Sequence, residues 1–305
     1  MFSLRLKIAS LVSLSVSLVF SSILTAAEVA LTSVKDSGIY INDPGNDPPN
    51  SNSDNGSSNR GDGGRMDLNK FGDGFFVQFD FSSVSLGPSQ SITSAVLELS
   101  AASNSNVSGA GLNIIGAALK DPWGEGIGNS GSSGDTGFPW GPASIGDASF
   151  NFKSATAVGL GSPGFAGQTI ATAGTAWAGP NGAGRDAADQ AGSGSLFDFN
   201  YIDTFAGSGN RFNDIPFSAS GISVVTDMID GSLDNNGFNI YVKDFTGNRA
   251  DFAGHKVATR ELSQAAFGND SIAPTLRLTI VPEPSSLVLL GLGSLGIVGL
   301  RRHRS

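Results

Sequence analysis

The sequence predicts an all-β protein, an antiparallel β-sandwich with long loops rich in Gly, Ser and Asn. Three observations support this prediction. Apolar and polar residues alternate in several short segments, which is the pattern of half-buried strands. Glycine supplies 42 of the 305 residues, too many for a helical protein. Hydrophobic residues make up 39% of the chain, which is enough to form a core and argues against disorder.

Three segments alternate most clearly, FFVQFDF, GFNIYVKD and PTLRLTI. Each places its apolar residues on one face, as a strand with one buried side requires. Two further segments, ITSAVLELSA and LNIIGAAL, are apolar on both faces and fit central strands. The predicted core faces are Phe75, Val77, Phe79 and Phe81, then Phe238, Ile240 and Val242, then Leu276, Leu278 and Ile280.

One segment has helical spacing. In GISVVTDMIDG, residues Ile222, Val225 and Ile229 share a face and Gly231 follows as a stop. Three Gly/Ser/Asn-rich tracts read as loops, and no linker divides the patterned region, so we predict one domain over residues 28–281. The three tracts are Asn42–Gly64, Gly124–Gly146 and Gly159–Gly194.

The first 27 residues have the layout of a secretory signal peptide. Arg5 and Lys7 precede the apolar stretch Ile8–Ile23, and small residues follow. We predict an apolar helix here, export through the Sec translocon and cleavage after Ala27. An uncleaved membrane anchor is the alternative interpretation of the same segment.

The last 24 residues, 282–305, form a second distinct segment. Pro282, Glu283 and Pro284 precede an uncharged apolar run over 285–300. As a helix this run would be about 24 Å long, against about 30 Å for the hydrocarbon core of a bilayer, so it spans only marginally. The chain then ends in a basic cluster that would stay on the cytoplasmic side, Arg301, Arg302 and Arg304.

This order of tripeptide, Leu/Gly-rich helix and terminal arginines resembles a PEP-CTERM sorting signal. The resemblance implies processing by a membrane-embedded exosortase in a Gram-negative bacterium that makes exopolysaccharide. It also implies that the C-terminal transmembrane-like helix holds the protein in the inner membrane only transiently. A permanent C-terminal anchor is the alternative.

The order of fragments in the body resembles a DNRLRE-type domain. The fragments that carry the resemblance are FVQFDFSS, ITSAVLELS, WGEG, AWAGPNGAGRD, VVTDMIDGSLDNNGFNIYVKD, ATRELS and APTLRLTI. The resemblance implies a jelly-roll β-sandwich related to carbohydrate-binding modules of secreted proteins.

Composition excludes several kinds of chemistry. The chain contains no cysteine, so disulfides, Cys-ligated zinc and thiol nucleophiles are absent. The net charge of the chain is −9, and five of its 18 basic residues lie in the two terminal segments. The remaining domain is therefore strongly acidic, which disfavours binding to nucleic acid.

Three tryptophans in Gly/Pro-flanked loops are the candidate carbohydrate-binding side chains. Sugar rings stack on aromatic planes while neighbouring polar groups bond the hydroxyls. The alternative is that each indole packs into an open end of the sandwich. The candidates are Trp123 with Glu125, Trp140, and Trp177 with Arg185 and Asp186.

Calcium is the one cofactor that the sequence suggests, because it needs only oxygen ligands. A polar tract offers such ligands but lacks the EF-hand spacing, and a solvated loop is the alternative. The candidate ligands are Asp54, Asn55, Asn59 and Asp62.

Catalysis is not predicted. A Ser-His-Asp triad would have to use His255, and no nucleophile-elbow sequence accompanies it. We predict a secreted, exosortase-processed matrix protein at the cell surface that binds exopolysaccharide weakly. A secreted glycan hydrolase or lyase and a purely structural or adhesive protein are the alternatives.

Overall fold

The computed structural model describes most of the predicted domain. The described residues are 26–39, 65–102, 112–125, 144–160, 169–178, 182, 184–191, 197–201, 214–246 and 254–283. Within these ranges no helix is long and apolar enough to cross a membrane. The two predicted terminal helices lie outside the described residues.

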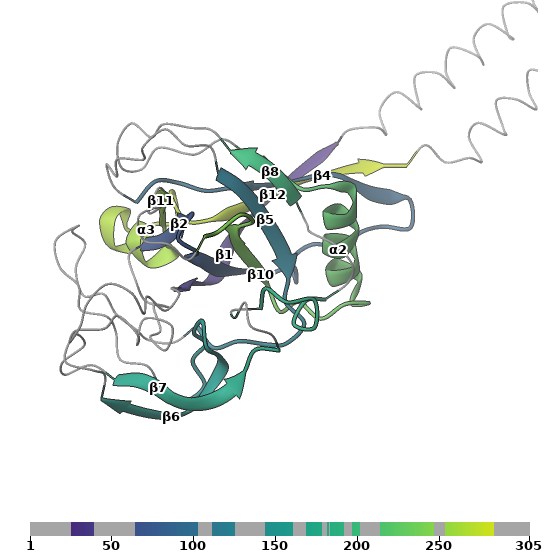
Figure 1. Cartoon of the computed structure of the whole chain (residues 1–305). Coiled ribbons are helices and arrows are strands. Elements are labelled where there is room, and N and C mark those ends of the chain that lie inside the picture. Colours follow the sequence, from purple (N-terminus) through teal and green to yellow (C-terminus); the bar gives the residue numbers. More distant parts are fainter. Residues whose placement is uncertain are drawn as a thin grey trace, which may run out of the picture.

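An eight-stranded sheet forms the body of the domain (Figure 1). Every neighbouring pair of strands in it is antiparallel, which confirms the coarser prediction of a mostly β fold with an antiparallel sheet. In spatial order its strands are β8 (Phe197–Tyr201), β5 (Leu112–Ala118), β10 (Phe238–Val242), β3 (Gly74–Phe79), β1 (Ala27–Ile39), β12 (Thr275–Pro282), β4 (Gln90–Glu98) and β9 (Ile215–Pro216).

The sheet curls because β1 belongs to both of its halves. Residues 27–32 of β1 pair with β12, and residues 33–39 pair with β3. The register shifts between Ser33 and Lys35, and such an irregularity lets one strand bend from one half to the other. The two halves therefore face each other across a common core.

The core follows the predicted alternation. Leu276, Leu278 and Ile280 of β12 meet Phe75 and Val77 of β3 in one apolar cluster. The faces predicted for the segments 75–81, 237–244 and 274–280 are all confirmed as parts of this cluster.

Two strand pairs accompany the main sheet. Strand β2 (Arg65–Asn69) pairs with β11 (Gly254–Ala258), and β6 (Phe152–Leu160) pairs with β7 (Thr169–Ala176). The pair β6–β7 lies apart from the main sheet in Figure 1. The expectation of a loop throughout Gly159–Gly194 is therefore wrong, because β7 lies within it. Its residues are small or β-branched, so little apolar alternation marks it.

Two helices are described. Helix α2 (Ala219–Asp230) is the predicted one, and it begins at the N-cap Ser218 and ends at Gly231 in the left-handed region. Helix α3 (Arg260–Phe267) was not predicted, because it is short and only half of its residues are apolar. It follows β11 directly and lies beside β1 (Figure 1).

Candidate functional site

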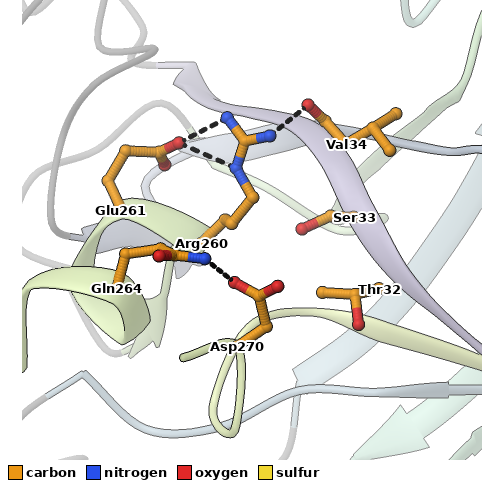
Figure 2. Close-up of a pocket in the computed structure, with 7 residues that line it drawn as sticks. All are labelled: Thr32, Ser33, Val34, Arg260, Glu261, Gln264 and Asp270. Carbon is orange, nitrogen blue, oxygen red and sulfur yellow. Dashed lines mark hydrogen bonds and ion pairs between the residues drawn. The ribbon is translucent and has the colours of Figure 1, made fainter. Parts of the chain in front are cut away.

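A pocket of about 730 Å³ lies between β1 and α3 (Figure 2). Strand β1 supplies one wall, and α3 with the loop after it supplies the other. Most of the lining groups are polar, and Val34 is the exposed apolar member at 40% exposure. The lining residues are Thr32, Ser33, Val34, Arg260, Glu261, Gln264 and Asp270.

Local capping fixes the helical wall. The Thr259 hydroxyl accepts a hydrogen bond from the Leu262 amide at 3.1 Å, which starts the helix. Gly268 ends it with a φ of 66°. The Ser263 hydroxyl donates to the Asn269 carbonyl at 2.8 Å and so ties down the following loop. Asp270 is thereby held opposite the helix, where it accepts a hydrogen bond from Gln264.

Arg260 spans the mouth of the pocket from α3 to β1 (Figure 2). Its guanidinium donates to Glu261 Oε1 through Nε at 3.1 Å and Nη2 at 2.8 Å. Its Nη1 donates to the Val34 carbonyl at 2.6 Å. The side chain therefore fixes the spacing of the two walls and neutralises one carboxylate of the lining.

Behind the pocket lies Asp36, whose side chain is fully buried. Its Oδ2 accepts hydrogen bonds from the Ser33 hydroxyl at 3.0 Å and the Arg260 backbone amide at 3.1 Å. Burial raises the pKa of Asp36 well above its ordinary value, and the negative charges of Glu261 and Glu125 add to the rise.

Glu125 joins the same cluster from the loop after β5. Its Oε1 accepts from the Asp36 backbone amide at 2.8 Å and lies 3.6 Å from Arg260 Nη2. Burial raises the pKa of Glu125, and Glu261 raises it further. Glu125, predicted as a sugar ligand, is therefore used to hold β1 in this structure.

The pocket can form hydrogen bonds with a polyhydroxylated molecule. Hydroxyls, an amide, a guanidinium and carboxylates line one open hollow, and they supply both donors and acceptors. Within the part of the chain that the structure describes, no group of three or more His, Asp or Glu side chains is placed to hold a metal ion.

Trp123 and Trp177 are buried rather than presented at a surface. They are 4% and 6% exposed and pack on Phe76, with ring centroids 5.3 and 5.4 Å from its own. Their indole N–H groups donate to the carbonyls of Asn236 and Ser149 at 2.9 and 2.8 Å. These surroundings match the alternative interpretation, in which each indole packs into the protein. Neither ring face is open to a sugar in this structure.

Arg185 is also enclosed. Its guanidinium carbon lies 5.5, 4.9 and 4.9 Å from the ring centroids of Phe150, Tyr241 and Phe245. Its Nη2 donates to the carbonyl of Gly72. Burial lowers the pKa of Arg185 to about 10, which leaves the side chain charged at neutral pH. A structural role fits this cage better than a ligand contact.

The predicted site residues therefore do not form one site. Asp186 is half-buried beside Arg185, and its carbonyl accepts from the Asp189 amide at 2.9 Å. The remaining predicted residues lie outside the described residues. These are Trp140, the calcium candidates Asp54, Asn55, Asn59 and Asp62, and the tail residues Pro284, Arg301, Arg302 and Arg304.

The processing positions lie at one end of the sheet. Ala27, the predicted cleavage residue, is the first residue of β1 and pairs with Ile280 of β12. Pro282 ends β12 opposite Gln90, and the Glu283 amide donates to the Ser89 carbonyl at 2.6 Å. The chain thus enters and leaves the domain on paired strands.

Sequence reasoning missed the pocket between β1 and α3. Two signals were available in the sequence. Thr259 followed by Glu261 in the first turn is the pattern of a helix start. Asp36 lies within β1, where it pairs with Val77, and a charged residue among strand positions indicates polar partners nearby.

The comparisons with known proteins concern the C-terminal tail. The model of the PEP-CTERM protein-sorting motif matches residues 281–304. No curated protein is significantly similar to the chain. The match confirms the predicted sorting motif, which indicates a secreted, membrane-transiting protein of Gram-negative bacteria that exosortase processes.

Proposed function

We propose that this is a non-catalytic matrix protein of the cell surface that binds exopolysaccharide weakly. The observation that carries the proposal is the sorting motif at residues 281–304, because this motif marks the protein for secretion and processing. Export would use the Sec translocon and pass transiently through the inner membrane. The acidic body supports a partner other than nucleic acid.

The polysaccharide would bind in the pocket between β1 and α3. Gln264 and Asp270 offer an amide and a carboxylate at its rim, and Thr32 offers a hydroxyl from the facing strand. Sugar hydroxyls donate and accept at once, so they match such a mixed lining. The open form of the pocket suits a segment of a long chain rather than an enclosed small molecule.

Affinity electrophoresis in gels that contain the organism's own exopolysaccharide tests this site. Wild-type protein is expected to be retarded relative to its mobility in plain gels. The double variant Gln264→Ala/Asp270→Ala is expected to lose most of the retardation. Asp230→Ala is the matched control, because it removes one exposed carboxylate at the end of α2, away from the pocket residues.

Two results would contradict the binding proposal. In the first, the wild-type protein migrates freely in the gel but self-associates in sedimentation experiments. This result would support the purely structural or adhesive alternative. In the second, the wild type and the double variant are retarded equally, which would show that the polysaccharide binds at another site.

The enzyme alternative has one observation in its favour. Glu261 lines the pocket and its charge acts on the nearby Asp36 and Glu125, and glycoside hydrolysis uses paired carboxylates. Asp36 is enclosed, however, and Glu125 uses Oε1 to accept a backbone hydrogen bond from Asp36, so we favour the binding proposal. Release of short sugars from acidic polysaccharides, abolished by Glu261→Gln, would establish a hydrolase or lyase instead.

We also propose that the body is a DNRLRE-type domain with a jelly-roll arrangement. The order of sequence fragments supports it, and the curled antiparallel sheet is compatible with it. A crystal structure of the whole domain, compared with DNRLRE-type domains, would test the jelly-roll assignment.

A further inference from the structure

The sorting motif begins inside the folded sheet. The matched residues start at 281, and β12 continues to Pro282. Val281 pairs with Ser91 and Pro282 with Gln90 in the antiparallel register with β4. The next residue, Glu283, donates its amide hydrogen to the Ser89 carbonyl at 2.6 Å. Three residues of the motif are thus held by the domain, with no spacer between fold and motif.

The turn that receives the motif is itself closed by hydrogen bonds. The Gln90 amide donates to the Gly87 carbonyl at 3.0 Å. The Gln90 side chain accepts from the Gly87 amide at 2.8 Å through Oε1. The Ser89 carbonyl is therefore presented from a fixed turn, and Glu283 has a preformed partner.

Both ends of the domain meet here. Ala27 pairs with Ile280, one residue before the matched motif. In Figure 1 the start of β1 and the end of β12 run together out of the body of the domain. The N-terminal segment and the sorting motif thus attach to the same end of the sheet.

We propose that exosortase must first detach Val281–Glu283 from β4 and from the Gly87–Gln90 turn, so the fold limits the rate of processing. This inference rests on the proposed function, because it assumes that exosortase cuts the tail. Removal of the tail breaks one peptide bond. Its acyl carbon passes to water or to an acceptor amine, and the tail leaves with a new amino group.

The physical reason is competition for the backbone. An enzyme that binds an extended segment uses the segment's backbone N–H and C=O groups. In the folded domain the Glu283 N–H is already bonded to Ser89, and the adjoining residues are paired with β4. Strand ends open locally at a small fraction of the free energy of global unfolding, so detachment is accessible but lowers the rate.

A removable cross-link tests the proposal on the full-length precursor. The chain has no cysteine, so Ser91→Cys/Val281→Cys places one pair on directly opposed positions. Opposed Cα atoms of an antiparallel pair lie about 4.5–5.5 Å apart, within the range of a disulfide. In membranes that contain exosortase, the oxidised variant is expected to lose its tail at least about tenfold more slowly than the same variant after reduction.

The single variants Ser91→Cys and Val281→Cys are the controls. They carry the same substitutions without the cross-link, and Val281→Cys also measures the effect of changing the motif itself. Equal rates for the oxidised and the reduced double variant would overturn the proposal.

A second variant tests the opposite direction. A Gly-Ser-Gly-Ser insertion between Ile280 and Val281 keeps residues 281–304 intact and removes them from the register with β4. Processing is expected to be faster than in the wild type, and an equal or slower rate would count against the inference. A wild-type precursor that keeps its tail equally with and without exosortase would overturn both the proposed processing and this inference, whereas a processed wild type with equal rates for the oxidised and reduced double variant overturns this inference alone.

Discussion

The backbone amide of Arg260 donates a hydrogen bond to the buried carboxylate of Asp36 across 3.1 Å, and this bond joins the first turn of α3 to β1. The carboxylate is enclosed beside Glu261 and Glu125, so its negative charge is unfavourable there. The wall of the pocket is thus held by a group that the fold favours in its protonated form.

Asp36→Asn is expected to flatten the dependence of stability on pH. Because the pKa of Asp36 is raised in the folded state, that state binds more protons than the unfolded one between the ordinary value of 3.8 and the raised value. The contribution of Asp36 to the free energy of unfolding therefore falls as the pH rises above about 4. Asparagine keeps an acceptor for Arg260 and cannot ionise. Urea unfolding at several pH values measures the slope.

Asp80→Asn is the control of opposite sign. Asp80 is exposed, and hydrogen bonds from Ser82 lower its pKa. Its contribution is present above pH 3.8 and is lost as pH falls through the lowered value. An Asp36→Asn protein that keeps the wild-type slope above pH 4 would contradict the assignment.

Trp123→Ala and Trp177→Ala are each expected to destabilise the domain by about 3–5 kcal/mol, because both remove a large ring from a packed cluster. The substitutions Trp123→Phe and Trp177→Phe keep much of the packing and lose the indole hydrogen bond, so they should cost less. Thermal unfolding of the four variants measures the order of their stabilities. At a temperature where all four variants are folded, polysaccharide retardation should match the wild type, and a selective loss would revive the stacking interpretation.

Two glycines form a matched pair. Gly237 and Gly231 have φ values of 80° and 81°, so both disfavour a side chain. A Cβ at Gly237 would lie 2.6 Å from the Val77 carbonyl oxygen, whereas one at Gly231 would meet nothing within 4 Å. Gly231→Ala should cost about 1 kcal/mol of unfolding free energy, from backbone conformation alone. Gly237→Ala should cost clearly more, and equal losses in chemical denaturation would refute the steric argument.

Arg277 on β12 links its two neighbouring strands. Its Nε lies 2.7 Å from Glu28 on β1, and its Nη2 bonds to Glu98 on β4. The Glu98 side chain is 4% exposed and that of Glu28 is 59% exposed. Glu98→Gln should therefore cost about 1–3 kcal/mol of unfolding free energy. Glu28→Gln should cost under about 0.5 kcal/mol. Chemical denaturation of both variants measures the difference, and the reverse order would contradict it.

The sequence predicted the parts of the fold whose signal is local. Alternation identified β3, β10 and β12, and spacing with a terminal glycine identified α2. One local prediction was incomplete, because β3 is buried on both faces. Phe76 on its outer face packs between Trp123 and Trp177, which come from distant loops.

The sequence signals at Thr259 and Asp36 do not by themselves place the pocket, because it depends on contacts between remote segments. Asp36 and Arg260 lie more than 200 positions apart in the chain and meet only when β1 and α3 are placed side by side. The tryptophans had the composition of a sugar site, but composition does not decide burial. Trp177 is enclosed because Phe76 and Ser149 occupy its surroundings.

The division of β1 between two partners also orders the assembly of the domain. Its second half pairs with β3, which follows soon after it in the chain, so this contact can form early. Its first half pairs only with β12, the last strand described. The first residues of the domain therefore cannot pair until the last strand is available. The sheet closes only after nearly the whole chain has been synthesised. Until β12 is available, the first half of β1 lacks its partner and this part of the sheet stays open.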